Sequence, residues 1–243
     1  MVEALILRTW PVREADQIVS FFTRDQGKLK GIAKSSAKSR KRFGGALEPL
    51  TYVLASYAEK PRQELVRLDA CEIVASPLSE PVDYGRAAAL AFVAEVLEET
   101  LQDRDPQDAV FRLALAVLEQ THTERIWLPV TYFGLWMVRL MGWMPELGRC
   151  TVCTRAFAGD AAYFESERDG LVCAEHRHAA ARALSAESLG VAARIFREPI
   201  AALAAEEWPR NRAEDLRRFT LQALERHLER RLRSVQALRR LGE

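Results

Sequence analysis

Three cysteines and one histidine in the second half of the chain have the spacing of a metal site. Cys150 and Cys153 are separated by two residues, as are Cys173 and His176, and nineteen residues lie between the two pairs. A two-residue gap lets the chain turn so that both side chains of a pair reach one ion. Two such pairs complete a tetrahedron of three thiolates and one imidazole, which is typical of zinc ribbons.

Four protein ligands leave no open coordination position, so the spacing predicts a structural Zn²⁺ rather than a catalytic one. His178 lies two residues after His176 and is an alternative fourth ligand, although we favour His176. A small hydrophobic cluster of ordinary cysteines is the competing interpretation, and the double pairing disfavours it. Cys71 lies on a predicted strand and is expected to be a buried, small hydrophobic residue.

Basic side chains are concentrated between residues 24 and 42. These nineteen residues contain eight basic side chains and one acidic side chain, a net charge of +7. Segment 34–42 has too few apolar residues to pack, so we expect a mobile loop that binds phosphates with little sequence preference. A merely solvated surface is the alternative. The predicted DNA-binding residues are Arg24, Lys28, Lys30, Lys34, Lys38, Arg40, Lys41 and Arg42.

The charge of the whole chain, +1, conceals an uneven distribution. Residues 1–80 carry 13 basic and 10 acidic side chains (+3), residues 81–209 carry 12 and 19 (−7), and residues 210–240 carry 10 and 4 (+6). Both ends are therefore basic and the middle is acidic. This asymmetry suggests that a polyanion contacts the two ends, with solvated surface again as the alternative.

Short runs of alternating apolar residues fill the first 75 positions and predict five strands. A turn at Asp25-Gln26-Gly27 separates the second run from the third. Five strands with a long irregular link between the third and fourth indicate an OB-type barrel, and an SH3-like barrel would give a similar pattern. The predicted strands cover residues 4–9, 17–23, 28–33, 51–57 and 64–74.

After Pro77 and Pro81 the apolar period changes from two toward 3.6, which predicts helices at 90–101, 106–119 and 129–141. Leucines at 221, 224, 228 and 232 predict one further helix, rich in arginine on its other faces. We therefore expect an α+β multidomain protein. Residues 1–78 would form the OB-fold domain and residues 79–243 a helical domain, with a zinc-ribbon-like motif inserted at 147–178.

Aromatic side chains on such a barrel are candidates for stacking with bases, as in OB-folds that bind single strands. Phe43, Tyr52 and Tyr57 are the candidates, and packing inside the barrel is the alternative. The sequence contains no run of about 18 uncharged apolar residues, and Met1 to Ala4 does not resemble a secretory signal. A cytoplasmic protein in a reducing compartment is expected, since four cysteines do not suggest a disulfide scaffold.

Several phrases of the chain resemble the RecO family of bacterial recombination mediators. They are Leu5-Ile-Leu-Arg-Thr9, Glu14-Ala-Asp-Gln-Ile-Val19, Phe22-Thr-Arg-Asp-Gln-Gly-Lys28, Lys30-Gly31, Gly45-Ala-Leu-Glu-Pro49, Gly170-Leu-Val-Cys173, and Arg226-His-Leu to Arg233-Ser234. The resemblance spans nearly the whole chain and is densest in the first 75 residues. Two features depart from the family's zinc-bearing members, which often have four cysteines and a glycine after the second: Thr154 follows Cys153, and His176 takes the last position.

The resemblance implies binding of single- and double-stranded DNA, annealing of complementary strands, and replacement of single-strand-binding protein by the RecA recombinase. It also implies a partnership with RecR and a place near the bacterial nucleoid. Screening of two phosphate backbones by the basic segment, together with the arginine-rich terminal helix, would provide the mechanism.

Two other function classes compete with this one. A zinc-dependent nucleobase deaminase needs a His-x-Glu arrangement and a free metal position, whereas here Glu175 precedes His176 in a set of four ligands. The sequence also has no Walker A loop and no Gly-x-Ser-x-Gly elbow, so no enzymatic activity is expected. A protein-interaction scaffold without DNA contact is the second alternative, and the acidic middle of the chain would suit it.

Overall fold

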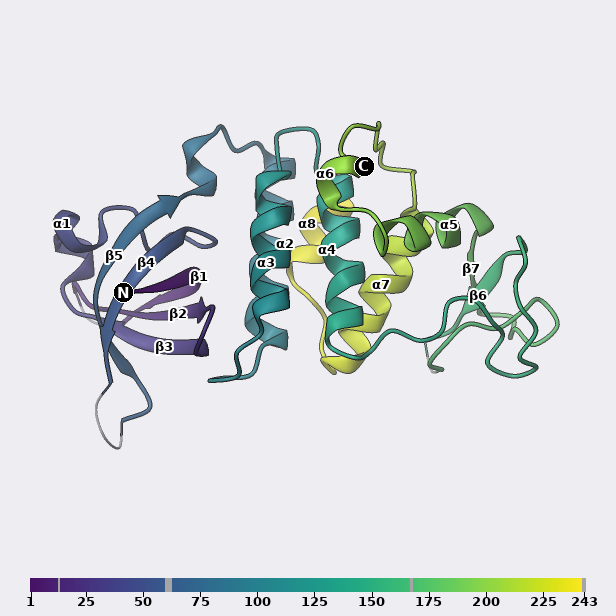
Figure 1. The fold of residues 1–243 in the computed structure, drawn as a ribbon, viewed down its shortest axis with the longest axis horizontal. Helices are drawn as coiled ribbons and strands as arrows, with labels where there is room; N and C mark the ends of the chain where they lie inside the picture. The colour runs from purple at the N-terminus through teal and green to yellow at the C-terminus, as the bar shows by residue number, and fades with distance from the viewer. Residues whose placement is uncertain (13, 60–62, 167, 242–243) are drawn as a thin grey trace.

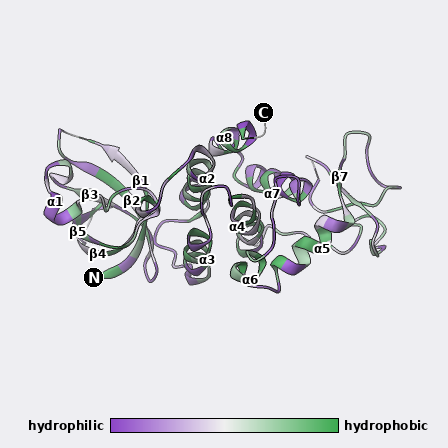
Figure 2. Ribbon diagram, turned by 90° about the horizontal axis from the view of Figure 1, so that it is seen from above, coloured by the Kyte–Doolittle hydropathy of each residue, from purple (hydrophilic) through white to green (hydrophobic). Residues whose placement is uncertain are grey.

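The computed structural model describes residues 1–12, 14–59, 63–166 and 168–241, and it has three parts arranged in a row (Figure 1). A β-barrel lies at one end and a helical body in the middle. A small two-stranded sheet with long loops lies at the other end. The view from above shows the same order (Figure 2). The expected combination of an OB-like barrel with a helical C-terminal part is thereby confirmed.

The barrel is closed, with strand order β1-β2-β3-β5-β4. All neighbouring strands are antiparallel except β3 and β5, which pair in parallel through residues 31–33 and 66–68. Five strands in this closed order are the arrangement of an OB-type barrel. The strands are β1 (Val2–Pro11), β2 (Gln17–Thr23), β3 (Gly27–Ala33), β4 (Tyr52–Ala58) and β5 (Val66–Ala75).

Strands β1 and β2 are buried on both faces, which explains why their sequences are nearly continuous apolar runs. Ile6 and Phe21 belong to the core inside the barrel. Leu5 and Phe22 point the other way and belong to the core of the helical body. The Phe22 ring meets Phe111 of the helical body edge to face, with ring centroids 5.5 Å apart. The barrel is therefore joined to the helices by shared hydrophobic packing.

Segment 34–42 is not the irregular loop that its composition predicted. It forms a 3₁₀ turn, η1 (Ser36–Lys38), and a short helix, α1 (Arg40–Phe43), which packs near β5. Phe43 supplies the missing apolar anchor, because its side chain is buried in the barrel core. Ala46 and Leu47 join it there, so apolar residues just outside the basic run hold the segment in place.

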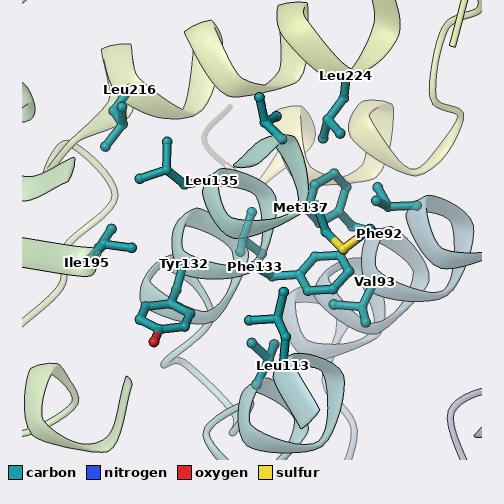
Figure 3. Packing of buried hydrophobic residues seen from close by; sticks show 14 of the residues in the cluster. Phe92, Val93, Leu113, Tyr132, Phe133, Leu135, Met137, Ile195, Leu216 and Leu224 are labelled. Carbon is teal, nitrogen blue, oxygen red and sulfur yellow. The ribbon is translucent and has the colours of Figure 1, made fainter. Parts of the chain in front are cut away.

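The helical body is built around α4, whose residues are buried on nearly every side. Figure 3 shows Phe133 and Met137 of this helix among side chains from the neighbouring helices. Phe133 and Phe92 meet edge to face. The elements are η2 (Pro77–Ser79), α2 (Tyr84–Thr100), α3 (Asp108–Glu119), α4 (Trp127–Leu140), α5 (Ala186–Ile195), α6 (Ile200–Leu203), α7 (Glu214–His227) and α8 (Ser234–Arg240).

The single terminal helix predicted through the leucines at 221–232 was wrong. The chain leaves the helix after His227, and Glu229 adopts a positive φ of 52°. A residue in the left-handed region commonly ends a helix. Leu224 belongs to α7, whereas Leu232 lies in the link before α8, yet both are buried in the same core. The leucine periodicity thus identified the core residues correctly but missed the change of direction.

The third part of the molecule extends beyond the predicted 147–178 insert. Its two-stranded sheet pairs β6 (Ala162–Phe164) with β7 (Arg182–Leu184). Phe164 contacts Phe219 of α7, which attaches the sheet to the helical body. Within the described ranges, no helix combines the length and the apolar composition needed to cross a membrane.

Candidate metal centre and basic surfaces

The structure brings Cys150, Cys153, Cys173 and His176 together. One ligand atom from each lies within 4.8 Å of the others. Each pair sits on a tight turn, in which the amide of Thr154 donates to the carbonyl of Cys150 and that of His176 to the carbonyl of Cys173. The paired spacing folds locally into the two corners that the sequence predicted.

The dimensions of this cluster fit a tetrahedral metal ion. The Sγ atoms of Cys153 and Cys173 are 3.9 Å apart, and Cys150 Sγ is 3.9 Å from His176 Nδ1. A tetrahedron with metal–sulfur bonds of about 2.3 Å has edges of about 3.8 Å. Cys150 and Cys173 are buried, whereas Cys153 lies at the surface. Three thiolates and an imidazole, closely spaced and partly shielded, could hold a metal ion with all four positions filled.

His178 takes no part in the cluster. Its backbone amide donates to the Glu165 carboxylate, and its ring Nε2 lies 3.8 Å from the same carboxylate. The turn at Cys173 instead directs Nδ1 of His176 toward the thiolates, 3.2 Å from Cys173 Sγ. Of the two histidines considered from the sequence, His176 is therefore the one placed to ligate.

Five of the eight predicted DNA-binding residues share one surface, which we call the η1–α1 surface. Lys34, Lys38, Arg40 and Lys41 are exposed, and none of them has an ion-pair partner among the residues that the structure describes. Arg42 is half-buried and anchors the segment. Its guanidinium donates to Ser39 Oγ and to the carbonyl of Lys34, and it lies over the Phe43 ring.

The other three predicted residues face the helical body instead. Lys28 is buried, and its ammonium group donates to the carbonyl of Glu98. Lys30 lies 3.6 Å from the Asp103 carboxylate. Arg24 pairs with Glu3 and with Asp108. These side chains hold the barrel against the helices, and they are separated from the η1–α1 surface, which lies at the far end of the barrel (Figure 1).

The candidate stacking aromatics are all engaged within the protein. Phe43 is buried, which rules it out as an exposed platform. The Tyr52 hydroxyl donates to the Glu3 carboxylate, and this hydrogen bond raises the pKa of Tyr52 to about 12. Tyr57 packs edge to face against Phe21, and burial raises its pKa. Cys71 is buried as expected, and burial raises the pKa of its thiol to about 12.

The basic C-terminal stretch forms a second cationic surface that the sequence only partly indicated. Five arginines of this stretch line a pocket beside Trp127, together with Arg182 from β7. The charge excess was visible in the sequence. The contact with Trp127 was not visible, because this residue lies more than 80 positions before Arg210. The packing of α4 against α7 brings the indole next to the arginines.

Two family models match the chain. The model described as "Recombination protein O N terminal" matches residues 1–77, and the one described as "Recombination protein O C terminal" matches residues 81–236. The first range contains the barrel. The second contains the helical body as far as the beginning of α8, and the cysteine and histidine cluster.

Curated relatives match over similar lengths. A protein of Koribacter versatilis named "DNA repair protein RecO" is 54% identical over 239 residues, which cover 98% of each chain. One of the same name from Anaeromyxobacter sp. (strain K) is 30% identical, covering 98% of this chain and 95% of the relative. Another, from Syntrophobacter fumaroxidans, is 33% identical over 75% of this chain and 73% of its own. The protein described here therefore belongs to the RecO family.

Proposed function

We propose that this protein is a DNA-binding recombination mediator in DNA repair. Its role would be to bind single- and double-stranded DNA, anneal complementary strands, and assist loading of RecA onto DNA coated with single-strand-binding protein. The observation that carries the proposal is the η1–α1 surface. There, four cations are exposed without carboxylate partners among the described residues, on a chain whose relatives are named DNA repair proteins.

The mechanism we infer is electrostatic. Four cations are available to neutralise phosphates: Lys34, Lys38, Arg40 and Lys41. None of them forms an ion pair with a carboxylate of the described residues, whereas Arg24 and Lys30 do. Binding of phosphates releases condensed counterions and gives affinity with little sequence preference. Two strands repel each other over a screening length of about 10 Å at 0.1 M salt. Cations lying between the strands would lower that repulsion, so no bond has to be made or broken.

A structural role suits the metal centre. We propose that Cys150, Cys153, Cys173 and His176 hold Zn²⁺, which would fix the loops around β6 and β7 and supply no open coordination position. This centre lies at the opposite end of the molecule from the η1–α1 surface (Figure 1). The metal ion would therefore not contact DNA that is bound at the barrel. RecR, single-strand-binding protein and, indirectly, RecA are the proposed protein partners.

The decisive experiment is an annealing assay with complementary oligonucleotides. The test variant replaces the four exposed cations Lys34, Lys38, Arg40 and Lys41 with glutamine and keeps Arg42, which anchors the segment. The matched control replaces four exposed arginines elsewhere with glutamine, so that both variants lose the same charge: Arg112, Arg125, Arg149 and Arg197. The test variant should lose most of its annealing activity and its affinity for single strands, while the control keeps both.

Circular dichroism and zinc content should be unchanged in both variants, which excludes misfolding as the cause. If the unmodified protein does not bind oligonucleotides even at low salt, the proposal fails and a protein scaffold becomes the better assignment. Equal annealing by the test variant and the control would remove the η1–α1 surface from the mechanism.

A further inference from the structure

A pocket of about 590 Å³ opens between α4, α7 and α8 of the helical body. It is distant in sequence from the η1–α1 surface and uses none of its residues. The side chains that line it form a cationic rim and an apolar wall. Its arginines are Arg182, Arg210, Arg217, Arg218, Arg231 and Arg239, and its acidic residues are Glu214 and Glu225.

Both acidic side chains already have partners within the protein. Glu214 pairs with Arg218 at 3.5 Å. Glu225 accepts a hydrogen bond from the backbone amide of Leu232, in the link between α7 and α8. Four of the arginines have no ion-pair partner within the described part of the chain: Arg182, Arg210, Arg231 and Arg239. The pocket therefore carries a strong excess of positive charge.

Arg217 is the most informative of these residues, since its side chain is only 6% exposed. Its guanidinium donates to Thr131 Oγ1 and to the carbonyls of Arg210 and Arg212, and no carboxylate in the described ranges pairs with it. Burial lowers the pKa of Arg217 to about 10; the carboxylates of Glu214 and Asp215 oppose this shift, and repulsion from Arg210 and Arg218 adds to it. All of its direct hydrogen-bond acceptors are neutral, so an anion bound in the pocket would stabilise this buried cation further.

One wall of the pocket is apolar and includes a large aromatic ring. The indole of Trp127 lies beneath the guanidinium groups of Arg217 and Arg210, at 4.9 Å and 6.0 Å from its centroid. Val130, Leu221 and Val235 continue this wall. A ligand that fits both surfaces has an anionic part and a flat, weakly polar part.

We propose that this pocket binds a nucleotide, with its phosphates against the arginine rim and its base against the Trp127 wall. Arginine is suited to phosphate because its planar fork donates two hydrogen bonds at once. Any base can stack on an aromatic side chain or on the plane of an arginine guanidinium group, and the pocket offers both. The nucleotide can be free or part of a strand, since the chemistry of recognition is the same. The inference does not depend on the proposed DNA binding by the barrel.

The test titrates adenosine triphosphate, tripolyphosphate and adenosine into the full-length protein by calorimetry. The test variant replaces Arg182, Arg231 and Arg239, which are exposed and can be changed without disturbing the core, with glutamine. The matched control replaces Arg197, Arg233 and Arg240, which are equally exposed and lie outside the pocket. We expect the test variant to bind the triphosphate at least about tenfold more weakly, equivalent to about 1.4 kcal/mol, with the control unchanged.

A short oligothymidylate is titrated in parallel, in protein whose η1–α1 cations have been neutralised, so that barrel binding does not mask the pocket. Pocket-dependent binding of the oligonucleotide but not of the triphosphate would identify the ligand as a nucleotide within a strand. Binding of tripolyphosphate as tight as that of adenosine triphosphate would overturn a role for the base. Equal affinities of the test and control variants for every ligand would overturn the site itself, whatever the barrel binds.

Discussion

The ammonium group of Lys28 lies 2.7 Å from the carbonyl oxygen of Glu98, at the junction between the β2–β3 hairpin and the end of α2. Around this bond the two parts are closely fitted. The amide of Arg104 donates to the carbonyl of Lys28, and Ser20 donates to the Glu98 carboxylate. At Gly27, whose φ is +72°, a Cβ atom would lie 2.4 Å from the carbonyl oxygen of Asp105. The hairpin is thus seated directly on the backbone that links α2 and α3.

Replacing Lys28 with methionine should destabilise the protein rather than weaken its DNA binding specifically. The variant loses a buried, charge-assisted hydrogen bond and leaves the Glu98 carbonyl unpaired, which costs about 1 to 3 kcal/mol. The same replacement at exposed Lys34 should change the free energy of unfolding by less than about 0.5 kcal/mol. Urea denaturation of both variants measures the contrast. Equal stability of the two would show that Lys28 does not hold the interface.

The salt dependence of DNA binding should report how many η1–α1 cations contact phosphates. For single strands, the slope of log affinity against log salt is about −0.7 per neutralised phosphate. Removing the four exposed cations, Lys34, Lys38, Arg40 and Lys41, should therefore flatten the slope by up to about 2.8. Anisotropy titrations at several salt concentrations give this number. A weaker affinity with an unchanged slope would mean that these residues act through folding instead.

Removal of the proposed zinc should loosen the end of the molecule that carries β6 and β7, and leave the barrel intact. Loss of the ion leaves three closely spaced thiols with no shared partner, and structural zinc sites contribute directly to folding. A strong chelator, or Cys153→Ser, should lower Tm by about 5 °C or more, because each kcal/mol shifts Tm by about 2 to 4 °C at this size. Hydrogen exchange should localise the change to the region around 147–184. Cys71→Ala, which removes a thiol from the barrel core without burying a new polar group, serves as the control and should leave hydrogen exchange around 147–184 unchanged.

Two helical glycines should respond to alanine with opposite signs. At Gly190 in α5 nothing lies within 4 Å of a Cβ atom, so Gly190→Ala should stabilise the protein by up to about 1 kcal/mol through helix propensity. At Gly134 in α4 a Cβ atom would lie 2.9 Å from Thr220 Cγ2. Thr220 is buried and bonded to the Leu216 carbonyl, so it has no room to turn away. Gly134→Ala should therefore be destabilising, by about 1 to 3 kcal/mol, as thermal unfolding would show.

Acid should weaken the attachment of α8 through Glu95. Burial alone would raise the pKa of this carboxyl. Hydrogen bonds from the Ser234 side chain and from the amides of Ser234 and Arg233 together lower it by more, so the net shift is downward. A carboxyl with a lowered folded pKa adds stability that is complete above its unfolded pKa, 4.5, and is lost as pH falls through the folded value.

The Glu95→Gln variant should therefore be less stable than the unmodified protein at pH 7, by about 1 kcal/mol for a partly exposed group. The difference should shrink below pH 4.5. Urea denaturation across this range provides the measurement, with Glu119→Gln as a control on an exposed carboxyl. A gap that stays constant with pH would mean that the Glu95 charge is not involved.

The sequence was informative wherever local spacing determines geometry. The Cys150 and Cys173 turns follow from a two-residue gap, and the five barrel strands follow from apolar alternation and turn residues. Prediction failed where distant parts of the chain decide. Composition alone could not show that Lys28 is buried against Glu98, since that requires the position of α2 relative to the barrel. Nor could periodicity distinguish one terminal helix from two, because Leu224 and Leu232 enter the same core from different elements.

The basic run at 34–42 failed for a related reason. Judged by its own residues it lacks the apolar content to pack, yet Phe43 at its edge is buried and fixes the segment. Similarly, arginine enrichment after residue 209 indicated a charged surface but not a pocket. Trp127, which turns that surface into a candidate site, comes from a helix formed much earlier in the chain.

The position of α8 has a consequence for synthesis on the ribosome. This helix, the last one described, packs against α2, which is the first long helix to follow the barrel. The barrel pairs mainly strands that are close in sequence, so it can form as soon as it emerges. Strand β1 and helix α4 also pack against α2, but the part of α2 that α8 covers stays exposed until roughly 140 further residues have been translated, at about 5 to 20 residues per second. For several seconds the nascent chain therefore carries a finished barrel and an unfinished helical body that chaperones would recognise.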